Sequence, residues 1–453
     1  MGRFASWANM HRGSQAVGDP NHREHREGWP SGRTNHYWFD LNRDWLLVQH
    51  PESRARVDTF HRWKPNLLGD YHEMGSNSTY FFQPGVATRE HPLKPQKNLE
   101  LTRAIAEFHA RRLGGDGQLF YSEESFDDFY PGKGSTYPDL NGSVGVLFEQ
   151  ASARGHLQET VNGDLEFSRA IKNHFLTSLS MLEGAQAHRQ ELLRYQADFP
   201  RQALASARRD PVAGYVFSCP LDRARCGAMI DILLHHQIEV YSLAEGLERD
   251  GATFDPAWSW AVPMEQPQYL LAKALFERRT EFEDSIFYDI STWTLPLAFG
   301  AASAELDRPT LSGGLLGERL TGPIDFAGRF AADSESYAYV FEWDSYYAPR
   351  ALNRLLEAEF RPRVATRPFQ GETPEGARDF TFGTIIVPLG AQDEVDGLTD
   401  LLATIAREDG VDVWSVRSGL TPDGVDLGSP NVRPLEPIRP LMVVGGGASC
   451  LLY

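Results

Sequence analysis

The chain has 453 residues, of which 41% are hydrophobic and 23% are charged, and its formal net charge is −18. A chain of this length exceeds what one hydrophobic core usually covers, so more than one domain is expected. The sequence has no run of about eighteen apolar residues that could span a bilayer, and its negative charge argues against general nucleic-acid binding, which needs a cationic surface.

The first part of the chain predicts alternating helices and buried strands. Apolar residues recur at helical spacing in two segments, and each is followed by an apolar run that ends in polar residues. His72 lies near the carboxyl end of the first strand and Glu149 near that of the second. Because ligands gather at the carboxyl ends of strands in an α/β sheet, we expect both side chains at one edge. In chain order the four segments are "PESRARVDTFHRW", "PNLLGDYHE", "PQKNLELTRAIAEFHARRLGG" and "GSVGVLFEQAS".

The rest of the chain predicts further α/β units. A helix-periodic stretch from about Asp164 to Arg208 closes the first domain, and "RRDPVAG" is typical of a linker. A weak internal repeat follows, because the segments that begin at Gly214 and at Ala338 both predict a strand, a helix and a strand. We therefore predict three domains, the last being the truncated start of a further α/β unit. They comprise residues 1–208, 209–436 and 437–453.

His72 has two interpretations. Histidines at strand ends are more often hydrogen-bonded structural residues than metal ligands. Asp70 and Glu73 flank His72, and a carboxylate close to a ligating imidazole fixes its tautomer and raises its basicity. The segment is therefore compatible with a structural role and with a role in metal binding.

Glu149 and the pair Asn42–Arg43 also have a functional and a structural interpretation. A glutamate at the end of an apolar strand suits either a general base in a cleft or one half of a buried salt bridge. Arg43 offers a planar fork that suits a carboxylate, and Asn42 adds further donors. The alternative is a turn held by Asp40 and Asn42.

Several motifs together carry a resemblance to a known family. They are "FDLNRDW", "GDYHEMGSN" and "FYPGKGSTYPDLNGSVGVLFEQ". In this order and spacing they resemble the zinc carboxypeptidase family, in which an Asn-Arg pair precedes a zinc-binding histidine and then a catalytic glutamate. The resemblance covers about Gly2 to Gly184. It implies an α/β fold with a truncated carboxypeptidase-like mixed sheet flanked by helices.

The resemblance implies roles for individual residues. His72 resembles a zinc ligand. Glu149 resembles the general base that takes a proton from water and passes it to the leaving amine. Asn42 and Arg43 resemble the pair that holds the terminal carboxylate of a substrate.

Two further roles have alternative matches in this sequence. Tyr130 resembles the tyrosine that closes over the substrate, and Tyr137 in the same loop is the alternative. The arginine that stabilises the oxyanion matches Arg26 or Arg33, and the spacing favours Arg26.

In one respect the sequence departs from the family. The family's other zinc ligands come from a His-x-x-Glu motif upstream of the Asn-Arg pair, and no such motif precedes Asn42. Two matches, at His156 and His188, follow Glu149 and lie on predicted helix faces, where solvated polar residues are usual. A catalytic zinc site needs about three protein ligands. We therefore expect Zn²⁺ as a cofactor of the complete protein, and we expect the present chain to bind zinc weakly and to be inactive.

The second half resembles a different kind of fold. "LMVVGGGAS" is similar to the first strand and turn of a glutamine-amidotransferase-like region, and the α/β units after residue 208 are expected to resemble such folds. No set of nucleophile, histidine and acid is visible there, so we predict no catalytic role. Cys219 and Cys226 form either a bridge or two buried thiols.

The sequence thus predicts a zinc-dependent metallocarboxypeptidase, a hydrolase of C-terminal peptide or analogous amide bonds, with a peptide as its substrate. The alternative is a peptide- or carboxylate-binding protein that has lost the metal site. A metal-independent hydrolase that uses Asp70 and Glu149 would instead keep its activity in a chelator. The resemblance suggests an exported protein, whereas substrate preference and oligomeric state cannot be read from the sequence.

Overall fold

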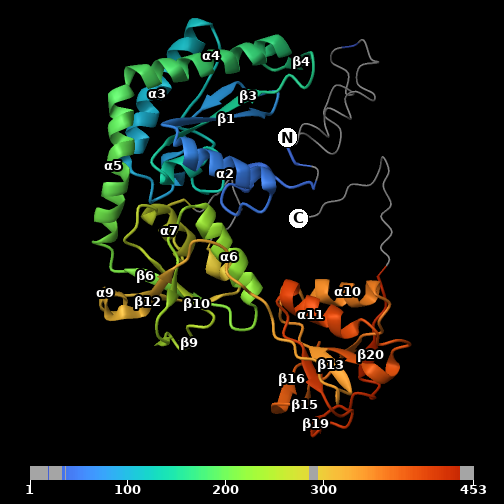
Figure 1. Cartoon of the computed structure of the whole chain (residues 1–453). Helices are drawn as coiled ribbons and strands as arrows, with labels where there is room; N and C mark the ends of the chain where they lie inside the picture. Colours follow the sequence, from blue (N-terminus) through green and yellow to red (C-terminus); the bar gives the residue numbers. More distant parts are fainter. Residues whose placement is uncertain (1–18, 20–32, 36, 285–293, 439–453) are drawn as a thin grey trace. The chain divides into compact units, whose positions relative to one another are not determined.

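The computed structural model describes residues 19, 33–35, 37–284 and 294–438. The chain divides into two compact units, one formed by residues 1–218 and 229–322 and the other by residues 219–228 and 323–453. Each unit combines helices with sheets (Figure 1), which confirms the predicted α/β class. The domain boundaries at residues 208 and 436 stay predictions. None of the helices in the described ranges is long and apolar enough to cross a membrane.

A three-stranded mixed sheet forms the centre of the region before residue 208. Strand β3 lies in the middle, parallel to β1 on one side and antiparallel to β2 on the other. All four segments predicted from periodicity are present, and the predicted helical stretch divides at His188 into two helices. The elements are α2 (Pro51–Trp63), β1 (Leu67–Met74), β2 (Tyr80–Phe82), α3 (Gln96–Gly115), β3 (Val144–Ala151), β4 (Leu157–Thr160), β5 (Gly163–Glu166), α4 (Phe167–Ala187) and α5 (Arg189–Ala207), with short helical turns η2 (Leu41–Arg43), η3 (Ala87–Arg89) and η4 (Tyr137–Leu140).

Side chains of this sheet alternate between two faces. Val146 and Phe148 of β3 belong to a core that also contains residues of α3, α4 and α5. Tyr71 of β1 stacks on Phe148 with ring centroids 4.6 Å apart, so it shares the helix-covered face. Because successive residues of a strand point to opposite faces, His72 and Glu149 lie on the other face. The apolar core thus orients the polar residues away from the helices.

Two five-stranded sheets follow, and they share one topology. The first has the order β11-β6-β10-β7-β12 and the second β18-β13-β17-β14-β20. All the neighbouring pairs in both sheets are antiparallel. In each, two strands joined through a helix flank an inserted antiparallel strand, as in the split β-α-β arrangement of ferredoxin-like folds, with an added edge strand. The segments that begin at Gly214 and Ala338 thus each fold as a strand, a helix and a strand.

The elements of the two repeats have matching roles. Those of the first are β6 (Gly214–Ser218), α6 (Arg223–His235), β7 (Tyr241–Leu243), β8 (Leu247–Arg249), β9 (Ala252–Phe254), β10 (Ser259–Pro263), α7 (Tyr269–Phe276), α8 (Leu295–Ala298), β11 (Ala302–Leu306), α9 (Arg308–Thr310), η5 (Leu311–Leu315) and β12 (Leu316–Arg319). Those of the second are β13 (Ala338–Phe341), α10 (Ala348–Glu357), β14 (Arg363–Ala365), β15 (Phe369–Thr373), β16 (Gly376–Phe380), β17 (Ile385–Pro388), η6 (Leu389–Ala391), α11 (Leu398–Asp409), β18 (Trp414–Val416), β19 (Asp423–Gly424) and β20 (Val432–Pro434).

The strands after residue 208 run antiparallel to their neighbours in both sheets. The segment that carried the amidotransferase-like resemblance, residues 441–449, lies outside the described residues, so that resemblance stays a prediction.

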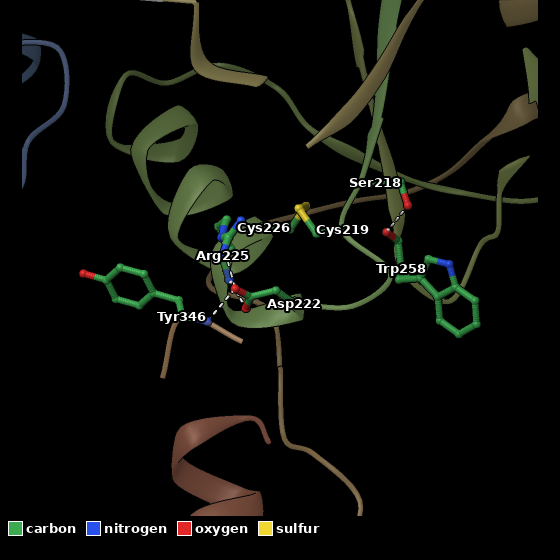
Figure 2. Close-up of a disulfide and its surroundings, with 7 residues drawn as sticks. All are labelled: Ser218, Cys219, Asp222, Arg225, Cys226, Trp258 and Tyr346. Carbon is green, nitrogen blue, oxygen red and sulfur yellow. Dashed lines mark hydrogen bonds and ion pairs between the residues drawn. A yellow bond between two sulfur atoms is a disulfide. The ribbon is translucent and has the colours of Figure 1, made fainter. Parts of the chain in front are cut away.

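Cys219 and Cys226 form a disulfide, which decides between the two possibilities left by the sequence. Figure 2 shows the bridge at the start of α6, beside Asp222. One oxygen of Asp222 accepts a hydrogen bond from the backbone N–H of Arg225, and the other accepts from that of Tyr346. The carboxylate thus holds the first turn of α6 and the segment before α10 together.

Candidate functional site

His72 and Glu149 are opposite each other on neighbouring strands. The parallel register of β1 and β3 pairs His72 with Glu149 and, two residues earlier, Asp70 with Leu147. His72 Nε2 lies 2.7 Å from Asp70 Oδ1, which confirms that these two side chains share a face. The sheet therefore brings the predicted histidine and glutamate together on the face away from α3 and α4.

Asn42 connects the turn η2 and the loop that contains Gly134 to Asp70 on this face of the sheet. It lies in η2, where its backbone N–H donates to Asp40 Oδ1, so the turn expected from these two residues is present. Its side-chain Oδ1 accepts from the backbone N–H of Gly134 at 2.9 Å, and its Nδ2 donates to Asp70 Oδ2 at 3.0 Å. Since a backbone N–H can only donate, the amide orientation is fixed. Asn42 thus serves both the turn and the site.

Gly134 is a site residue that the sequence analysis missed. A Cβ at this position would lie 3.0 Å from Asp70 Oδ2 and 3.2 Å from Trp45 Nε1. Contacts this short are tighter than most that a Cβ makes, so glycine suits the close approach of the backbone to the carboxylate. The pair of glycines in "PGKGS" was the available signal.

Three groups face the ring nitrogens of His72. Nε2 lies 2.7 Å from Asp70 Oδ1, which only accepts when ionised, and 2.9 Å from Asn42 Nδ2, which only donates. A guanidinium only donates, so Nδ1 accepts from Arg33 Nη1 at 3.4 Å. The shorter contact of Nε2 with Asp70 and the donor at Nδ1 together favour the neutral tautomer that carries its proton on Nε2.

Burial and charge act against each other at the three ionisable groups. Burial opposes ionisation of Asp70, but hydrogen bonds from His72 and Asn42 outweigh it and hold the pKa of Asp70 below its usual value. Burial also disfavours the imidazolium, yet the hydrogen bond and charge of Asp70 raise the pKa of His72. Burial raises the pKa of Glu149 to about 7, against the opposing charges of His72 and Arg33. Glu149 can therefore exchange a proton near neutral pH.

The structure describes two of the three arginines that the sequence analysis singled out, Arg33 and Arg43. Arg43 Nη1 donates to the backbone carbonyl of Asn42, and its charge acts to lower the pKa of Glu149. Arg33 Nε donates to Asp40 Oδ2 at 2.8 Å while its Nη1 faces His72. Arg26, the arginine that the spacing favoured, lies outside the described residues. Of the two candidates for the oxyanion residue, Arg33 is the one with a described position beside His72.

The two candidate tyrosines have different surroundings. Tyr130 is buried, and its hydroxyl donates to the backbone carbonyl of Arg43 at 3.0 Å, so it contacts the segment that carries the Asn-Arg pair. Tyr137 is fully buried, and its hydroxyl bonds to His61 and His236 in the core. Tyr130 is therefore the tyrosine whose hydroxyl adjoins the candidate site.

The described residues do not provide a complete zinc site. Across residues 33–35, 37–284 and 294–438, no group of three or more histidine, cysteine, aspartate or glutamate side chains is arranged to hold a metal ion. His72 is the predicted ligand, but both of its ring nitrogens already have protein partners in this arrangement. Zinc binding would require ligands beyond this set.

Comparison with known proteins gives few matches. No family model matches the chain, and no curated protein does. A solved metallo-carboxypeptidase from Burkholderia cenocepacia is similar over 34% of this chain and 40% of its own, with 16% sequence identity and a TM-score of 0.27. The chain thus spans less than half the length of that protein. A TM-score this low identifies neither fold nor activity, so the site is interpreted from its own geometry.

Proposed function

We propose that the complete protein is a zinc-dependent metallocarboxypeptidase that hydrolyses a C-terminal peptide or analogous amide bond. The observation that supports this most directly is the pairing of His72 with Glu149 across β1 and β3, with Asn42 hydrogen-bonded to Asp70 beside them. A histidine and a glutamate on one face of a sheet, with Asn42 and Arg43 in the adjoining turn, are some of the groups that such a reaction needs.

Glu149 acts in this proposal as the general base. It removes a proton from the attacking water and returns it to the leaving amine, which a carboxyl group with a pKa of about 7 does at neutral pH. Arg43, with Asn42, pairs with the terminal carboxylate of the substrate. Arg33 supplies positive charge on the side of His72, where the oxyanion would develop.

The decisive test is Glu149→Gln in the full-length product. We expect retained folding and a fall in turnover of about 10²–10⁴-fold or more, because the amide is not a base. The matched control is Glu73→Gln, since Glu73 of β1 pairs with Gln150 of β3, lies on the face opposite to Glu149 and is exposed. Hydrolysis of a blocked dipeptide is the assay. Near-normal turnover of Glu149→Gln would remove Glu149 from the mechanism.

A carboxylate-binding protein without a metal is the second candidate. The incomplete ligand set among the described residues favours it, and zinc content separates the two. We expect the present chain, titrated with zinc, to bind it at best weakly. Stoichiometric submicromolar binding that is lost in His72→Ala alone would show that sufficient ligands lie within this chain. A full-length product that binds peptide, does not bind zinc and does not turn over substrate would establish the second candidate.

A further inference from the structure

A polar pocket lies on the helix-covered side of the sheet. Its volume is about 230 Å³, and its walls come from the loop after β1, the turn after α3, the end of β3, the β4–β5 hairpin and the start of α4. Gln150 lines it. Because Gln150 follows Glu149 in β3, its side chain points to the opposite face. The pocket is therefore separate from the Asp70–His72–Glu149 site.

Two buried amides form part of the pocket lining. Gln150 and Asn173 are only 2% and 3% exposed. Gln150 Nε2 donates to the carbonyl of Ala151 at 2.9 Å, which makes its Oε1 an acceptor, and Asn173 Nδ2 donates to that oxygen at 2.8 Å. These two bonds fix both amide orientations. Asn173 Oδ1 is consequently an acceptor, and it has no hydrogen-bond partner among the described residues.

The pocket lining also contains a buried hydroxyl without a hydrogen-bond partner among the described residues. Ser76 also lines the pocket, is 7% exposed, and its Oγ has no partner within the part of the chain that the structure describes. Buried polar atoms without a partner are costly. When such atoms line a pocket, a polar ligand with donors of its own satisfies them.

Charged side chains of both signs complete the lining. Arg169 of α4 and Asp164 of β5 are exposed and both line the pocket. The only hydrogen bond described for the Arg169 guanidinium within the pocket is a long one, 3.5 Å from Nη1 to Gln118 Oε1. A cation and an anion on one small pocket match a ligand that carries both charges.

We propose that this pocket binds a free α-amino acid. Its carboxylate pairs with Arg169, and its ammonium faces Asp164 and donates to the unsatisfied Asn173 Oδ1. A water molecule occupies about 30 Å³ in the liquid, so a pocket of about 230 Å³ holds one amino acid with a small or polar side chain and little else. This site does not depend on the proposed peptidase function, since it shares no side chain with that site.

Calorimetric titration with L-alanine, L-alaninamide and N-acetyl-L-alanine tests the proposal. Wild-type protein should bind L-alanine saturably and each blocked analogue at least about tenfold more weakly, because each analogue lacks one charge-assisted interaction. Arg169→Gln should weaken L-alanine binding about tenfold but leave L-alaninamide unchanged. Asp164→Asn should also weaken L-alanine binding about tenfold and leave the binding of N-acetyl-L-alanine unchanged.

The control removes an arginine elsewhere. Arg103→Gln changes an exposed residue of α3 that pairs with Glu123 and does not line the pocket, so L-alanine binding should stay at the wild-type level. Both charge variants alter exposed side chains, so folding, followed by circular dichroism, should be preserved. Absence of saturable L-alanine binding, equal binding of the blocked analogues, or an equal effect of Arg103→Gln and Arg169→Gln would each overturn the proposal.

Discussion

Acidification from pH 7 to pH 4 should lower the free energy of unfolding by several kcal/mol, because the protein buries neutral histidines. Burial lowers the pKa of His61 to about 4 and the pKa values of His91, His109 and His236 to about 3. The ordinary value is 6.5. Loss of hydration penalises the imidazolium in the core, so the folded protein resists protonation.

Hydrogen bonds show why two of these rings are held neutral. His236 Nε2–H donates to the carbonyl of Leu46 at 2.7 Å, which makes its Nδ1 an acceptor. The Tyr137 hydroxyl therefore donates to that nitrogen, and the Tyr137 oxygen accepts from His61 Nε2–H, each at 2.8 Å. Protonation of His236 would put a donor on Nδ1, opposite the donating Tyr137 hydroxyl. The directions of the hydrogen bonds between His236, Tyr137 and His61 would then have to reverse.

The direction of the pH effect follows from the difference between the folded and unfolded pKa values. Well above pH 6.5 the rings are neutral in both states, so this contribution to stability is fully present. As the pH falls below 6.5 the unfolded chain takes up protons that the folded protein does not, and the contribution is lost progressively towards pH 4 to 3. The lowering of the pKa of His61 from 6.5 to about 4 corresponds to about 3.5 kcal/mol at about 1.4 kcal/mol per pKa unit.

Urea unfolding between pH 7 and pH 4 measures this effect. In His236→Gln, which removes one titrating ring, the unfolding free energy should vary less steeply with pH below 6.5 than in the wild type. The matched control, His156→Gln, changes an exposed histidine and should leave the slope unchanged. Identical slopes in wild type and His236→Gln would contradict the assignment of acid sensitivity to this buried ring.

The helices and strands were predictable where one hydrophobic period dominates. "PESRARVDTFHRW" is α2 residue for residue, and the apolar runs before His72 and Glu149 are β1 and β3. Their meeting at one edge could also be predicted, because parallel neighbours align their carboxyl ends. The strand order in the two later sheets could not be predicted from the sequence. The strand β10 that separates β6 from β7 follows both in the sequence, and its insertion depends on tertiary packing.

In the candidate site, too, some features were predictable from the sequence and others depended on contacts between distant segments. The sequence identified Asn42, His72 and Glu149 by residue type, but not the hydrogen bond that connects Asn42 to Gly134, 92 residues later. Nor did residue type distinguish Tyr130 from Tyr137. The difference depends on the partners of the two hydroxyls, a backbone carbonyl near the site for Tyr130 and two core histidines for Tyr137. Contacts between distant segments decide both features.

Gly145→Ala should destabilise the protein by about 3 kcal/mol or more, at the upper end of what overpacking usually costs. A Cβ at Gly145 in β3 would lie 1.7 Å from the carbonyl oxygen of Ser135 and 2.6 Å from its carbon. Both are backbone atoms, so no side-chain rotation relieves the clash and the loop must move. That loop includes Gly134, whose N–H donates to Asn42, and the Gly145 N–H donates to Asp139.

The matched control is Gly115→Ala in α3, where an added Cβ meets no atom within 4 Å. Its unfolding free energy should stay within about 0.5 kcal/mol of the wild type, as for most surface substitutions. Urea unfolding at pH 7 compares the two variants. If Gly145→Ala were as stable as Gly115→Ala, the loop from Gly134 to Ser135 would not be pressed against β3. The hydrogen bond from Gly134 to Asn42 would then lose its structural support, and with it the position of Asn42 beside Asp70.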